Sequence, residues 1–178
     1  DLQTVDDPAV EKIRTQLEIP APQGYVFVRL YDSTAAMPDP IREIFENSSV
    51  AGVTILTRYI AILDEEGSTW SERALNAQSL PRTVSHELVH AYINSKIGIP
   101  YVDQLPTWYH EGVAIYFSNS GENQAIVTPN FRLYTTPPPQ YRQYALNFDY
   151  VESLLGRDAF QSLIRKSVAE ADADLILD

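Results

Sequence analysis

The sequence contains no cysteine and only three histidines among its 178 residues. Without cysteine, disulfide bonds and thiolate metal sites are excluded. No apolar run approaches the roughly 18 to 20 residues that a membrane span requires, so we expect no membrane insertion by this segment. Basic residues are scarce, 13 against 24 acidic ones, and the net charge of -11 disfavours nucleic acid as a partner because it would be repelled.

The composition is otherwise that of a folded protein, with 44% hydrophobic and 11% aromatic residues. A chain of this length favours a single domain over residues 1–178. Because it lacks cysteine and begins at Asp1 instead of methionine, we expect that a leading segment is removed and that the protein is extracytoplasmic. The sequence does not indicate an oligomeric state.

Local patterns predict an α+β fold class, with the strands in the first half and helices dominating the second. Asp-Pro pairs at residues 7–8 and 39–40 are typical helix starts. Alternation over 25–31 predicts a strand, and the β-branched run 50–63 predicts one long strand or two short ones. Residues 64–78 have no clear period and are predicted to form an exposed loop.

The second half reads as four helices around an irregular stretch. The first ends where Gly98 provides a C′ residue and Pro100 a stop. The predicted helices cover about 80–97, 106–117, 141–155 and 158–169, and the irregular stretch covers 119–139 with a short strand at 125–128.

All three histidines lie between residues 86 and 110, two of them in the stretch HELVH at residues 86–90. Helix positions i and i+4 are about 40° apart around the axis and about 6 Å along it, so His86 and His90 can converge on one ion. Glu87 is turned about 100° from His86 and can reach a water beside that ion. The pattern H-E-x-x-H therefore predicts two zinc ligands, His86 and His90, with Glu87 as general base.

The rest of this helix supports a polar site beside a buried core. Apolar residues lie on the side opposite the histidines, as a core-facing surface requires. A polar stripe accompanies the histidines and consists of Thr83, Glu87, His90 and Asn94.

A hydrolytic zinc site takes three protein ligands and keeps one position open for water. The pattern that adds glycine and then histidine after H-E-x-x-H is excluded, because Ile93 and Lys96 occupy those positions. The candidates are the neighbours His110 and Glu111 on the next predicted helix. Adjacent helical residues diverge by about 100°, so only one can face the metal. Spacing alone does not choose, and we favour Glu111. We also expect Gly112 to let this helix approach the first one closely.

HELVH followed by W-x-x-E-G-x-A resembles the gluzincin metallopeptidases, in particular the peptidase MA-like and aminopeptidase N group. Trp108, Glu111, Gly112 and Ala114 match the second motif, whereas His110 stands where relatives often have asparagine. The resemblance covers about residues 80–160. It implies that Glu111 is the third ligand and that each chain holds one Zn²⁺.

The resemblance also implies a zincin-like fold. We would expect a twisted, mainly antiparallel sheet with helices over about residues 1–98 and a helical subdomain over about 99–178. The zinc cleft would lie between these two parts.

Gluzincin relatives use a tyrosine at a helix start of the form Y-x-x-x-A to hydrogen-bond the developing oxyanion. The stretch YRQYALNFDYVESLLG over 141–156 resembles this form, which nominates Tyr141. Tyr144 and Tyr150 are alternatives within the same stretch.

Aminopeptidase N relatives also carry a G-x-M-E-N segment that holds the free amino group of the substrate. Residues 52–66 have no such segment, so we expect an endopeptidase acting on peptide or protein substrates. Residues 58–63 could be an edge strand that pairs with an extended peptide, or an ordinary core strand. The alternative function is a peptidase-like zinc-binding module that binds or senses proteins without catalysis.

Overall fold

A computed structural model describes residues 8–18, 24–47, 50–63, 80–99, 104–118 and 141–176. The predicted loop at 64–78 and short strand at 125–128 lie outside these residues. The elements, in chain order, are α1 (Pro8–Leu17), β1 (Phe27–Tyr31), η1 (Thr34–Ala36), α2 (Asp39–Glu46), β2 (Gly52–Ile55), β3 (Tyr59–Leu63), α3 (Leu80–Ile97), α4 (Thr107–Ser118), α5 (Tyr141–Leu155), α6 (Arg157–Glu170) and η5 (Asp174–Ile176). This mixed content confirms the predicted α+β class. None of the described helices combines the length and apolar character needed to cross a membrane.

The three described strands form one sheet in the order β1-β3-β2. β1 is parallel to β3, whereas β2 is antiparallel to it. The expectation of a mainly antiparallel sheet is therefore wrong for this part of the chain, where the sheet is mixed. The cause is the connection through α2: β2 runs back against the direction of β1, and a tight turn sends β3 forward again between them.

The run 50–63 forms two short strands, and their turn contains Leu56 with φ +59°. A left-handed conformation costs a leucine about 1–2 kcal/mol, so other contacts must hold this turn. β3 is the central strand, which confirms the core-strand alternative for 58–63 and makes the edge-strand alternative wrong. Among the described strands, β2 is an edge strand and stands next to α3.

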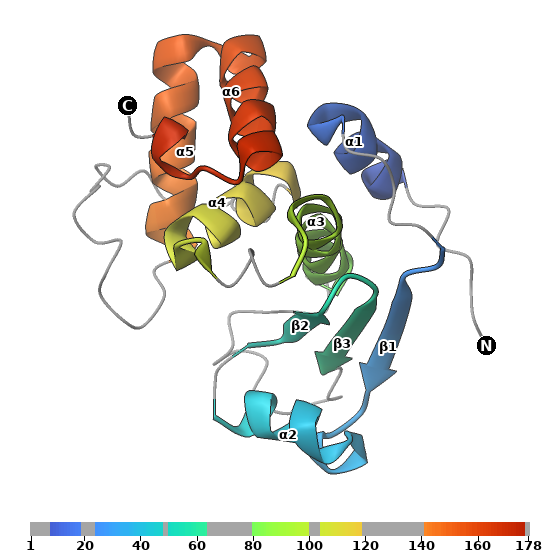
Figure 1. Cartoon of the computed structure of the whole chain (residues 1–178). Coiled ribbons are helices and arrows are strands. Elements are labelled where there is room, and N and C mark those ends of the chain that lie inside the picture. Colours follow the sequence, from blue (N-terminus) through green and yellow to red (C-terminus); the bar gives the residue numbers. More distant parts are fainter. Residues whose placement is uncertain are drawn as a thin grey trace.

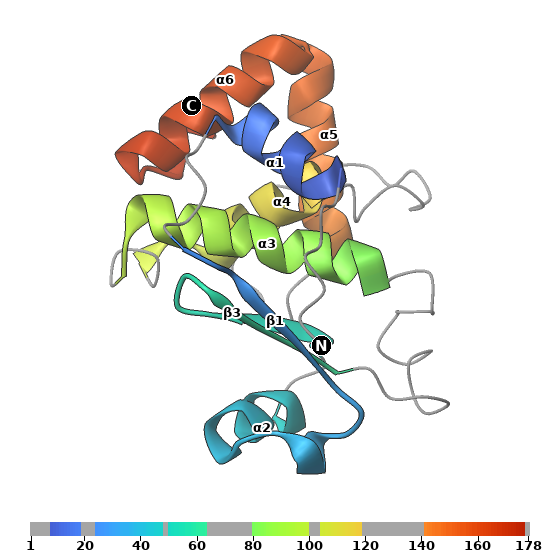
Figure 2. The same cartoon turned by 90° about the vertical axis from the view of Figure 1, so that its right-hand side faces the viewer.

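The pleat of β3 divides the apolar side chains between two layers. Ile60 and Ile62 belong to the large cluster on the α3 side, whereas Ala61 and Leu63 belong to a smaller one that includes Phe45 of α2. Figures 1 and 2 show this order of layers, with α2 on one side of the sheet and α3 on the other. α3 is thus buried between the sheet and the remaining helices.

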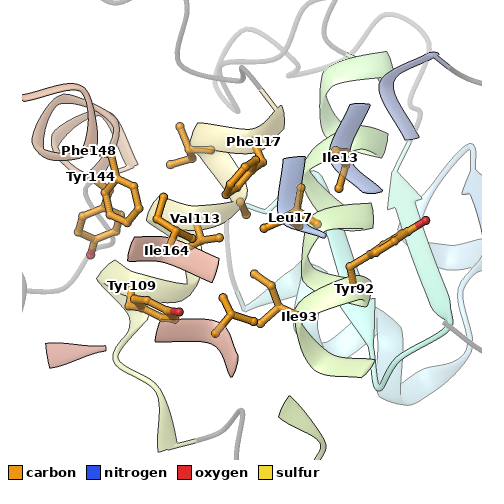
Figure 3. Packing of buried hydrophobic residues seen from close by; sticks show 14 of the residues in the cluster. Ile13, Leu17, Tyr92, Ile93, Tyr109, Val113, Phe117, Tyr144, Phe148 and Ile164 are labelled. Carbon is orange, nitrogen blue, oxygen red and sulfur yellow. The ribbon is translucent and has the colours of Figure 1, made fainter. Parts of the chain in front are cut away.

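The large cluster joins α1, α3, α4, α5 and α6 beyond the sheet (Figure 3). Five of its aromatic side chains are less than 3% exposed: Tyr109, Phe117, Tyr144, Phe148 and Phe160. α3 ends as predicted at Gly98, whose φ of +83° suits a glycine and whose N–H donates to the oxygen of Asn94 over 2.9 Å. The cluster fixes α4 against its neighbours and so fixes the side chains that α4 directs towards α3.

The atoms nearest to Gly112 belong to α5 and not to α3, contrary to the expectation. A Cβ atom at this position would lie 2.3 Å from Cε2 of Phe148 on α5. Gly112 therefore permits close contact between α4 and α5, since the three atoms nearest to this position all belong to that buried ring.

Gly112→Ala is expected to destabilise the protein by about 1–3 kcal/mol, because a fully buried ring has no room to move away. In a chain of this size each kcal/mol lowers the melting temperature by about 2–4 °C. Thermal unfolding followed by circular dichroism measures the change. A melting temperature equal to that of the wild type would contradict the close contact.

Candidate metal centre

Three side chains from two helices converge on one point. Nε2 of His86 lies 3.0 Å from Nε2 of His90, and both nitrogens lie close to Oε2 of Glu111, at 3.1 and 3.6 Å. α3 supplies the two imidazoles four residues apart, and α4 supplies the carboxylate. Among the described residues these three form a group that could hold a metal ion.

The carboxylate in this group is held ionised. Burial would raise the pKa of Glu111, but hydrogen bonds and charge from His86 and His90 outweigh it and leave this pKa well below its ordinary value. The opposite balance applies to His90: burial lowers its pKa, and Glu111 and the charge of Glu87 raise it above the ordinary value. These side chains thus favour a positive charge at the point where they meet.

The three side chains of this group are largely buried but retain some solvent exposure. The side chains of His86 and Glu111 are 14% and 17% exposed, and that of His90 is 7% exposed. A cation held by all three would therefore be reached by solvent from the side of His86 and Glu111.

Glu87 lies under the edge strand β2. The hydroxyl of Thr54 is 2.7 Å from Oε2 of Glu87 and 2.7 Å from its backbone oxygen, so its single hydrogen can go to either. A Cβ atom on Gly52 would lie 2.9 Å from Cγ of Glu87. β2 therefore packs closely against one side of the Glu87 side chain and provides a hydrogen-bond donor to its carboxylate.

Sequence reasoning did not identify Thr54 or Gly52 as site residues. The only signal was the alternation in β2, where Val53 and Ile55 pack into the smaller cluster and the two small residues face the other way. Small residues on one face of a strand permit a close neighbour, but they do not reveal which one.

His110 does not belong to the metal-binding group. Its Nε2 is 3.1 Å from Oδ1 of Asn94, and Nδ2 of Asn94 donates to the oxygen of Leu56 over 2.7 Å. Since Asn94 uses its amide hydrogen there, its oxygen must accept and Nε2 of His110 must carry the proton. Burial, together with the charge of His90, lowers the pKa of His110 to about 3, so the ring is neutral at neutral pH.

The three candidate tyrosines all lie on α5 but differ in environment. Tyr141 begins the helix, and its side chain lies outside the described ones. Tyr144 is buried in the large core cluster, and Tyr150 is 43% exposed. The prediction that Tyr141 is the oxyanion donor stays a prediction.

Comparison of the chain with models of protein families, with curated proteins and with solved structures found no match. The arguments that follow therefore depend on the chain's own residues and their geometry.

Proposed function

We propose that this protein is a zinc-dependent peptidase of the gluzincin type, with a zincin-like fold, and that it acts as an endopeptidase. The observation that carries the proposal is the convergence of His86, His90 and Glu111, with Glu87 next to the first of them in the sequence. Two imidazoles and one carboxylate are the ligand set of hydrolytic zinc sites that keep one position open.

The separations of the ligand atoms suit Zn²⁺. Tetrahedral bonds of about 2.0–2.2 Å place neighbouring ligand atoms about 3.3–3.6 Å apart. The three separations, 3.0, 3.1 and 3.6 Å, lie in or just below that range. A bound Zn²⁺ supplies Lewis acidity, which lowers the pKa of a coordinated water towards about 7 and polarises a carbonyl.

Glu87 is the general base in this proposal. Its carboxylate takes a proton from the attacking water and passes it to the amine that leaves. Burial at 6% exposure and the contact with Thr54 restrict the orientation of the carboxylate. Tyr141 is proposed to donate a hydrogen bond to the oxyanion of the substrate.

The substrate class follows from what the chain offers beside the site. Residues 52–66 contain no G-x-M-E-N segment to hold a free amino terminus. β2 pairs only with β3 among the described strands, so its other edge can pair with an extended peptide backbone. An internal stretch of a peptide or protein fits such an edge, whereas nucleic acid is disfavoured by the net charge of -11.

The direct test is metal content combined with cleavage of a peptide library, with and without a chelator. We expect one zinc ion per chain and internal cleavage that chelation abolishes. Bound zinc without cleavage of any peptide would contradict catalysis and support the alternative, a zinc-binding module.

Thr54→Val should lower kcat by about ten- to hundredfold without changing zinc content. The variant keeps the shape of the side chain but removes a hydrogen bond to a charged group, which contributes roughly 1.5–3 kcal/mol. Thr54→Ser restores the hydroxyl and should restore most of the activity. Steady-state kinetics on one peptide measures both, and a wild-type kcat for Thr54→Val would show that the hydroxyl does not orient Glu87.

A further inference from the structure

One ring nitrogen of His90 has no hydrogen-bond partner among the described residues. Nδ1 of His90 is buried, and no described residue hydrogen-bonds to it. Metal-bound histidines usually donate this second N–H to a carboxylate, a carbonyl or water, and that bond fixes the orientation of the ring. Among the described residues, only a contact of another kind can fix the orientation of the His90 ring.

The ring of His110 provides such a contact. Its centroid lies 4.2 Å from that of His90, with 38° between the planes, while His86 meets His90 nearly edge-on at 4.7 Å and 82°. His90 is therefore in contact with two other imidazoles. Only one of them, His86, belongs to the metal-binding group.

His110 is itself fixed by two hydrogen bonds in series. It donates to Asn94, one helical turn beyond His90 on α3, and Asn94 donates to the oxygen of Leu56 in the β2–β3 turn. Asn94 is 5% exposed, so water competes little for these bonds. These two hydrogen bonds connect α4, α3 and the β2–β3 turn, one helical turn away from His90.

We propose that His110 and Asn94 are positioning residues that set the ring orientation of His90 for metal binding. This inference rests on the proposed metal site but not on catalysis. Neither residue contacts the substrate or the ion in this proposal. His110 acts through its ring face, and Asn94 acts by fixing that ring.

The test is the affinity for Zn²⁺, measured by competition with a chromophoric chelator, and the visible absorption spectrum after loading with Co²⁺. Loss of such an orienting partner typically weakens metal binding 10–100-fold. We expect a loss of this size for His110→Ala and for Asn94→Ala, with a shifted cobalt spectrum in both. His110→Phe keeps a ring face against His90 and should lose less affinity than His110→Ala.

Val168→Ala is the control for a general loss of stability, since it truncates a buried side chain of α6 in the large apolar cluster. It should lower the melting temperature while leaving zinc affinity and cobalt spectrum unchanged. Zinc affinities for His110→Ala and Asn94→Ala within twofold of the control would overturn the inference. If His110→Ala does not fold, the zinc affinity of Asn94→Ala alone tests the positioning role.

The outcomes separate this inference from the proposed function. A wild-type protein that binds zinc but cleaves nothing would refute the peptidase proposal, and the affinities would still decide the role of His110. A wild-type protein that binds neither Zn²⁺ nor Co²⁺ would overturn both.

Discussion

Glu87→Gln is expected to retain one zinc ion per chain and to lose hydrolysis by about 10²–10⁴-fold, the usual contribution of a general base. The amide has the shape of the carboxylate and can still accept the hydrogen bond of Thr54, so the fold and the metal group should persist. It cannot take a proton from water at neutral pH. Metal analysis and steady-state cleavage of one peptide measure the two properties on the same sample.

Glu43→Gln is a suitable control for this substitution. Glu43 is an exposed glutamate on α2, on the opposite side of the sheet from α3, and the same chemical change there should leave kcat unaltered. Full activity in Glu87→Gln would refute the assignment of Glu87 as the base, whatever the metal content.

His86→Ala should abolish stoichiometric zinc binding and, with it, hydrolysis. Structural zinc sites with four ligands bind with roughly 10–16 kcal/mol, so one ligand accounts for about 3–4 kcal/mol, or two to three orders of magnitude in affinity. Glu111 would also lose its contact of 3.1 Å with His86. Metal analysis after dialysis, followed by titration with zinc, measures the loss.

Comparing the zinc affinity of His86→Ala with that of His110→Ala tests whether His86 is a ligand and His110 is not. Both substitutions remove an imidazole next to His90, and only His86 directs a nitrogen at Glu111. The loss of affinity should therefore be several times larger for His86→Ala. Equal losses of zinc affinity in the two variants would contradict the assignment of His86 as a ligand and His110 as a non-ligand.

The elements that the sequence predicts well are those whose boundaries depend on nearby residues. Pro40 and Gly98 favour a helix start and a helix end through their own backbone preferences, and α2 and α3 begin and end close to them. Sheet pairing is different. The parallel partner of Phe27 is Tyr59, and no local pattern at either residue distinguishes that register from an antiparallel one.

The candidate site divides in the same way. His86 and His90 are brought together by the period of one helix, which is readable in the sequence. The position of Glu111 depends on how α4 packs, and spacing alone left it open against His110. The contacts of Thr54 with Glu87 and of Leu56 with Asn94 join residues 33 and 38 positions apart. They depend on how the β2–β3 hairpin packs against α3, which no local pattern in the sequence predicts.

The contact between Gly112 and Phe148 has a consequence for engineering. Residues 80–118 include every proposed metal ligand, so a designer could try to graft this segment onto another scaffold. Glu111 is adjacent to Gly112, however, and the depth to which α4 settles against α5 sets where that carboxylate sits. A scaffold that lacks a ring packed against the bare glycine, as Phe148 is packed here, would receive all three ligands but would not bring them together.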